Sequence, residues 1–168
     1  MNKRLLTMMC VALLSGNATC AWAQQNEKPF VIPELVTWDA SNGVCKLSGR
    51  ILLSSKSSEV KRIGALFAED FNHMLNLSWK AYEQKKVKAG DIVLALDGDA
   101  SLGEEGYKLE VGEYVKVSAY KPKGLYWATR TILQMSEGTP NGLPKGKTID
   151  KPQYALRGFM LDVGRKYI

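Results

Sequence analysis

The sequence contains few of the residues that build disulfides or metal centres. Its 168 residues include three cysteines and one histidine. Cys10 and Cys20 lie in an N-terminal segment that we expect to be removed, so Cys45 remains alone and no disulfide can form within the mature chain. His73 has no cluster of metal-ligating residues around it, and such a histidine is more often a surface residue than a ligand. We therefore expect no metal site and no cofactor.

The chain also lacks an apolar run long enough to cross a bilayer, which requires about 20 residues. Its N-terminal run, residues 5–14, is only ten residues long and follows Lys3 and Arg4. Ala21-Trp22-Ala23 then fits the small-x-small cleavage pattern of a secretory signal. We expect residues 1–23 to be a signal peptide, the protein to be exported to the periplasm or secreted, and no segment to span the membrane.

A strong excess of charge of one sign is missing as well. The formal net charge is +6, and removing Lys3 and Arg4 from the 23 basic residues leaves 21 against 17 acidic ones, a net charge of +4. These basic residues are mostly scattered, which argues against nucleic acid as a partner. With 45% hydrophobic and 24% charged residues, the composition is that of an ordinary folded domain.

The apolar patterns that are present predict an α+β fold. We expect a mostly antiparallel sheet of about four strands, with two helices on one face, over residues 24–138. The glycine and proline breaks between residues 139 and 144 favour a linker over residues 139–153. Apolar residues at three- and four-residue steps predict the helices, whereas alternating or continuous apolar runs predict the strands. The helices are expected at 59–75 and 125–135, and the strands at 44–54, 91–97, 107–111 and 114–120.

Three consecutive motifs resemble a known family. EGYKLEV at 105–111, VKVSA at 115–119 and GLYWATRTILQM at 124–135 closely resemble the non-catalytic N-terminal domain of the β-N-acetylhexosaminidases of glycoside hydrolase family 20. RGFMLDVGRKY at 157–167 resembles the start of the family's catalytic (β/α)8 barrel. The resemblance implies that residues 154–168 are the start of a truncated TIM barrel, with an orphan first strand at 157–168. A complete barrel needs eight βα units over about 250 residues.

The family resemblance also implies a reaction. Members hydrolyse terminal β-linked N-acetylhexosamine from glycans with retention, using the acetamido group of the substrate as the nucleophile. An Asp-Glu pair in a His-x-Gly-Gly-Asp-Glu-like motif on a later barrel strand supports this step. No such motif occurs in these 168 residues. The chain is therefore expected to contain no catalytic residue, and to be inactive alone.

Three residues near the C-terminus carry the expected roles. By the resemblance, Arg157 would bind sugar hydroxyls in the full enzyme, whereas Asp162 and Arg165 would support the mouth of the barrel by hydrogen bonding. In the isolated chain we expect Arg157 instead to pair with a neighbouring carboxylate. A guanidinium suits the first role because its N–H donors form a rigid fork. N-acetylhexosamine glycans are expected to bind only together with the missing barrel. Because residues 159–163 are mostly apolar, the orphan strand is expected to promote self-association.

Other interpretations remain open beside the resemblance. The chain could be a stand-alone accessory or carbohydrate-binding domain that docks on a separately encoded barrel. A zinc hydrolase would require a His-Glu-x-x-His helix, which a single histidine nearly excludes. The acidic pairs at 69–70 and 104–105 are expected to be solvated rather than catalytic. Tyr126 and Trp127 are expected in the core rather than on a sugar-stacking surface.

Overall fold

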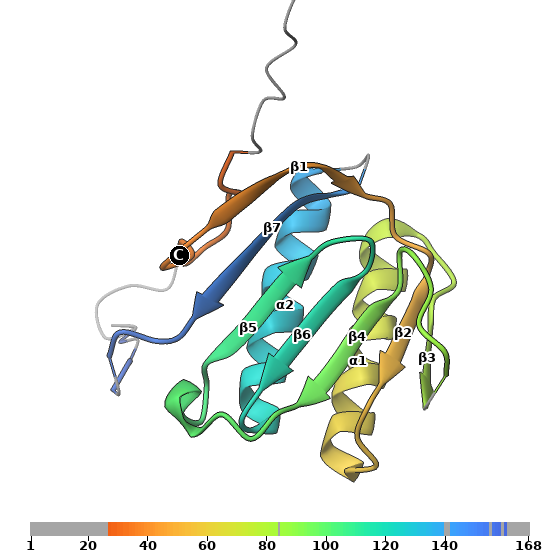
Figure 1. The fold of residues 1–168 in the computed structure, drawn as a ribbon. Coiled ribbons are helices and arrows are strands. Elements are labelled where there is room, and N and C mark those ends of the chain that lie inside the picture. The colour runs from red at the N-terminus through yellow and green to blue at the C-terminus, as the bar shows by residue number, and fades with distance from the viewer. Residues whose placement is uncertain (1–26, 84, 140–141, 155, 159, 161–168) are drawn as a thin grey trace, which may run out of the picture.

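The computed structural model describes residues 27–83, 85–139, 142–154, 156–158 and 160. A seven-stranded sheet, in the order β1-β7-β5-β6-β4-β2-β3, carries both helices on one face (Figure 1). The elements follow the chain as β1 (Asp39–Cys45), β2 (Arg50–Leu53), α1 (Ser58–Leu75), β3 (Lys80–Glu83), β4 (Ile92–Leu96), the short 3-10 helix η1 (Ala100–Leu102), β5 (Tyr107–Val111), β6 (Val115–Ala119), α2 (Pro122–Gly138) and β7 (Leu143–Asp150). Neither helix in this part of the chain is long and apolar enough to cross a membrane.

The α+β class, and the two helices on one face, are confirmed. The sheet itself is larger and more mixed than the sequence predicts. β3, β2, β4 and β6 pair in parallel, whereas β5 is antiparallel to both β6 and β7, and β7 is antiparallel to β1. The apolar patterns do not predict β3 and β7. The range 44–54 contains β2 and only the last two residues of β1, which begins at Asp39.

The stretch expected to be a linker contains β7, so that prediction is wrong for residues 143–150. Pro144 pairs with Val44 of β1, while pairing between β7 and β5 begins only at Gly146. The proline therefore lies where β7 has a single neighbour, a position that tolerates the missing N–H. The glycine and proline residues here mark the turn from α2 into another strand of the same sheet.

The core lies between the helices and the sheet. On β5, Tyr107, Leu109 and Val111 are buried while Lys108 and Glu110 point to the other face, the alternation of a half-solvated strand. α1 buries Phe71 between Phe67, at 5.0 Å in an edge arrangement, and Trp79, stacked at 4.3 Å. α2 lies close to the sheet because Gly124 leaves room for the carbonyl oxygen of Gly106.

A fully buried carboxylate closes one end of the sheet. Asp91, just before β4, accepts hydrogen bonds from the Ser48 hydroxyl at 2.7 Å, the Arg50 guanidinium at 2.8 Å and the Lys88 backbone N–H at 2.7 Å. Arg50 is the first residue of β2, whereas Ser48 and Lys88 lie in the loops before β2 and β4. The buried charge is thus both paired and hydrogen-bonded, as a buried carboxylate requires.

Candidate functional site

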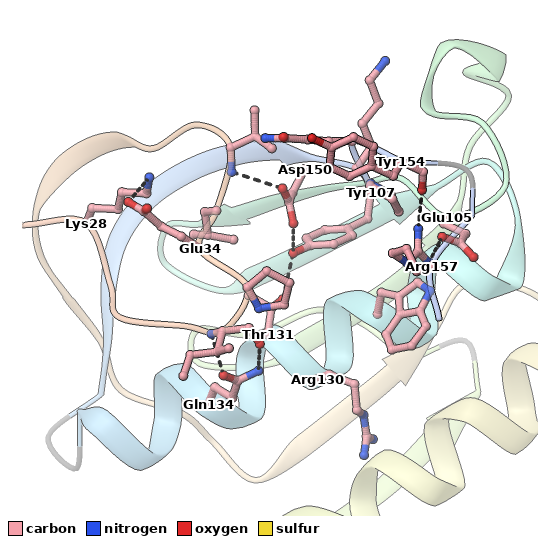
Figure 2. Close-up of a pocket in the computed structure, with 18 residues that line it drawn as sticks. Lys28, Glu34, Glu105, Tyr107, Arg130, Thr131, Gln134, Asp150, Tyr154 and Arg157 are labelled. Atoms are coloured by element: carbon pink, nitrogen blue, oxygen red, sulfur yellow. Dashed lines mark hydrogen bonds and ion pairs between the residues drawn. The ribbon is translucent and has the colours of Figure 1, made fainter. Parts of the chain in front are cut away.

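A cavity of about 820 Å³ opens beside α2 (Figure 2). One wall is the segment 28–36, which we call the N-terminal strap, and another is formed by Asp150 at the end of β7 with residues 151–154 and Arg157 beyond it. The floor contains Tyr107 of β5 and four residues from successive turns of α2, namely Trp127, Arg130, Thr131 and Gln134. Three parts of the chain that are distant in sequence therefore meet at this cavity.

The N-terminal strap is fixed by backbone bonds to a side chain of α2. Gln134 accepts from the N–H of Ile32 at 2.8 Å and donates to its carbonyl at 3.1 Å. Val31 and Leu35, on either side, are buried in the core. These contacts make the strap part of the folded body rather than a free leader.

A phenol joins the sheet to α2 at the bottom of the cavity. The Tyr107 hydroxyl donates to Asp150 at 2.9 Å and lies 2.7 Å from the Thr131 hydroxyl. Since the phenol has one proton, Thr131 must be the donor to Tyr107. The other oxygen of Asp150 accepts from the N–H of Val36 at 3.1 Å. Burial, as the largest cause, raises the pKa of Tyr107 above its ordinary value of 10, so the phenol stays protonated as a donor.

Glu105 lies at the edge of the cavity between two cations. The Lys123 ammonium contacts one carboxylate oxygen at 2.5 Å, and the Arg157 guanidinium contacts the other at 2.5 Å. Arg157 also donates to the carbonyl of Tyr154 at 2.9 Å. Hydrogen bonds from Lys123 first, and then from Arg157, hold the pKa of Glu105 below its usual value of 4.5.

This geometry corrects the expectation that the acidic pair at 104–105 is merely solvated. Glu105 has a side chain only 17% exposed, because Lys123 and Arg157 cover it. No local pattern could have shown this contact, since its partners lie 18 and 52 residues further along the chain. At 69–70, Asp70 pairs with Arg130 across the two helices at 2.6 Å.

The aromatic pair on α2 is divided between core and surface. Tyr126 packs against the core, as expected, but Trp127 is 38% exposed and lines the cavity, so its assignment to the core is wrong. The reason is geometric: consecutive residues of a helix point about 100° apart, so both cannot face the sheet. Tyr154, which also lines the cavity, adds further exposed surface there.

The other residues singled out from the sequence are dispersed. Asp162, Arg165 and most of the expected strand 157–168 lie outside the described residues. Met160, which is described, is 90% exposed. His73 lies exposed near the end of α1, and Cys45 is a free, buried thiol whose pKa is raised chiefly by burial. Of the described residues, Met160, His73 and Cys45 do not line the cavity, whereas Arg157 does.

The cavity has the chemistry of a binding surface. Within the described ranges, no three or more His, Cys, Asp and Glu side chains are grouped to hold a metal ion. Instead the walls combine an exposed indole with amide, hydroxyl, carboxylate and guanidinium groups. Such a combination can accept a polar molecule with one apolar face, or a partner surface of mixed character.

Comparisons with known proteins agree on one family. Residues 28–151 match the family described as glycosyl hydrolase family 20, domain 2. A β-N-acetylhexosaminidase of Cellulomonas fimi is 29% identical over 146 residues, and a β-hexosaminidase of Porphyromonas gingivalis is 24% identical over 183 residues. The matches cover 82% and 99% of this chain but only 29% and 24% of those relatives. The chain thus spans less than a third of the length of the curated relatives it matches.

A solved structure shares the fold. A Streptomyces plicatus β-hexosaminidase, solved in complex with its product GlcNAc, superposes with a TM-score of 0.70 at 24% identity. The match covers 86% of this chain and 30% of that protein. The sheet and helices described above are therefore an arrangement that recurs as one part of a larger molecule.

Proposed function

This chain belongs to glycosyl hydrolase family 20, and we propose that it is the non-catalytic N-terminal domain of an exported β-N-acetylhexosaminidase. In this proposal the domain has no hydrolase activity by itself. It works beside a catalytic barrel that removes terminal β-linked N-acetylhexosamine from glycans, with the acetamido group of the substrate as nucleophile.

The observation that carries the proposal is the match to domain 2 over most of the chain, combined with the small share of each relative that the chain covers. The substrate class follows from the names of the relatives, two of which are hexosaminidases. The missing His-x-Gly-Gly-Asp-Glu-like motif is consistent with chemistry that takes place elsewhere.

Arg157 is the residue that we propose to reach the substrate. It lies on the segment that leaves the sheet after β7, and its N–H groups can donate to vicinal sugar hydroxyls. Asp162 and Arg165, further along, are proposed to support the mouth of the barrel. The rest of the sugar pocket must come from other strands, because a single guanidinium does not enclose a sugar.

The DNA that follows codon 168 tests the proposal. We expect it to continue in frame and to encode the remaining barrel strands with an Asp-Glu pair. A stop codon, with no barrel encoded in frame or nearby, would contradict the proposal. Export is tested separately, by mass spectrometry of the exported protein, whose first residue should be Gln24.

The second candidate is a stand-alone accessory domain that binds carbohydrate, and the exposed Trp127 in the cavity favours it. In that case, N-acetylglucosamine oligosaccharides should quench the tryptophan fluorescence of the isolated chain. The quenching should be saturable, and the substitution Trp127→Ala should abolish it. Fluorescence that does not respond to the oligosaccharides would remove this candidate.

A further inference from the structure

Glu105 connects Arg157 to the folded body of the domain. Its two oxygens contact cations from two different segments, Lys123 in the first turn of α2 and Arg157 after β7. Of the three side chains, the carboxylate is the most enclosed, at 17% exposed against 56% for Lys123 and 45% for Arg157. It is therefore the central member of the cluster.

The backbone around Glu105 is held by the fold independently of Arg157. The N–H of Gly106 donates to the carbonyl of Leu102 at 3.1 Å, which closes the turn between η1 and β5. Lys123 belongs to α2, whose adjacent Gly124 packs against the carbonyl of Gly106. The sheet and the helix thus fix the position of the carboxylate. One of its oxygens contacts Lys123, and the other can accept from a second cation.

Arg157, by contrast, lies on a segment without regular structure. The described residues from 151 to 160 form neither helix nor strand. Of the five N–H donors of the guanidinium, one is used by Glu105 and one by the carbonyl of Tyr154. Beyond these two contacts with described residues, three N–H donors of Arg157 remain for a ligand.

We propose that Glu105 is a positioning residue for Arg157: it fixes one edge of the guanidinium so that the remaining donors face the sugar hydroxyls. The inference rests on the proposed function, in which Arg157 binds the terminal sugar. It adds that a carboxylate from the non-catalytic domain sets the orientation of a binding group on the segment that follows it. The link is electrostatic and short, so a change at residue 105 should affect sugar binding more than chemistry.

Trypsin cleavage of the 168-residue chain tests the contact itself. A held Arg157 cannot enter the specificity pocket of the protease, so the bond after Arg157 should be protected. Glu105→Gln keeps the size of the side chain but removes its charge, and it should accelerate this cleavage about tenfold, as followed by mass spectrometry. Glu104→Gln, the neighbouring change outside the cluster, should leave the rate unchanged. Equal rates in wild type and Glu105→Gln would overturn the proposal.

A second variant protects this test against a folding artefact. Lys123→Gln leaves the Glu105 carboxylate in place but removes the cation that holds its other oxygen, so cleavage after Arg157 should rise by a smaller factor. Near-ultraviolet circular dichroism of each variant should match the wild type. If Glu105→Gln disturbs that spectrum, the test uses Lys123→Gln instead. Equal rates of cleavage after Arg157 in wild type and Lys123→Gln would then overturn the proposal.

Kinetics on the enzyme that includes the barrel test the positioning role. With a chromogenic N-acetyl-β-glucosaminide, Glu105→Gln should raise KM about tenfold while kcat falls less than threefold, and Glu105→Asp should recover part of the loss. An unchanged or lowered KM would overturn the proposal, a lowered KM indicating that Glu105 competes with the sugar. An inactive wild-type enzyme would refute the proposed function instead, and the trypsin experiment would still report whether the contact exists.

Discussion

Asp91 and Glu105 are carboxylates held by cations at opposite ends of the same sheet. Asp91 precedes β4, where Ile92 pairs with Val115, whereas Glu105 precedes β5, where Tyr107 pairs with Ala119 at the other end of β6. Asp91 is fully buried, and its side-chain partners come from the start of β2 and the loop before it. Glu105 opens onto a cavity, and one of its partners belongs to the segment after the sheet. The first end is built for stability, whereas the second keeps groups accessible to a partner or a ligand.

A substitution in the core near the Asp91 end of the sheet should give the largest effect on stability. Phe71→Ala removes a ring packed between Phe67 and Trp79, and it should lower the free energy of unfolding by about 4 kcal/mol. Trp127→Ala, at the open cavity, should cost about 1 kcal/mol or less because the indole is already partly solvated. Urea denaturation measures both. Similar losses for the two variants would contradict the distinction between the two regions.

Removal of the buried carboxylate of Asp91 should give the second-largest loss of stability. Asp91→Ala leaves Arg50 and Ser48 without their shared acceptor and should cost about 3 kcal/mol in the free energy of unfolding. Asp39→Ala is the matched control, because its pair with Lys147, at 3.1 Å, is exposed on both sides. That control should cost less than about 0.5 kcal/mol. Equal costs would show that burial of the Asp91 pair has no energetic consequence.

Local patterns predict the parts of this fold that depend on local spacing. The helix expected at 59–75 is α1, at Ser58–Leu75, because its buried residues recur at three- and four-residue steps. The hairpin of β5 and β6 follows the predicted strands to within a residue. β7 was missed because its glycines and Pro144 are turn residues in most sequences, and only its neighbours β1 and β5 make it a strand.

The cavity was less predictable than the fold. Arg157 was named through the family resemblance, but its partner Glu105 is 52 residues away and has no motif. The Tyr107 hydroxyl bonds to residues 24 and 43 positions away, Thr131 and Asp150. Contacts of this range depend on strand order, which the sequence pattern did not contain.

Substitution of Tyr107, at the floor of the cavity, should give an intermediate loss of stability. Tyr107→Phe removes the hydroxyl that links Asp150 and Thr131, and it should cost about 1 to 2 kcal/mol in urea denaturation. A cost near zero would mean that the network does not hold the sheet to α2.

The same phenol predicts a dependence on alkaline pH. Because the pKa of Tyr107 is raised in the folded state, its contribution to stability is complete below the ordinary value of 10 and is lost as pH rises above it. The slope should be at most about 1.4 kcal/mol per pH unit from this group. In Tyr107→Phe, the free energy of unfolding should fall less steeply with alkaline pH, because this contribution is missing. An identical alkaline slope in wild type and variant would contradict the assignment.

Glu105 should give the smallest effect on stability. Glu105→Gln should change the free energy of unfolding by less than about 0.5 kcal/mol at neutral pH, since both cations are substantially exposed. Because the pKa of Glu105 is lowered, this small contribution is present above pH 4.5 and is lost as pH falls through the folded-state value. A loss comparable to that of Asp91→Ala would place Glu105 among the structural carboxylates.

The most direct measurement is hydrolysis of a chromogenic N-acetyl-β-glucosaminide by purified residues 24–168, with no other protein present. We predict a rate equal to that of the buffer blank, because in the proposed function the carboxylate pair that supports the reaction lies on the catalytic barrel and not in this domain. Reproducible turnover that follows the concentration of the purified chain would contradict it, because a domain proposed to be non-catalytic would then hydrolyse the glycoside alone.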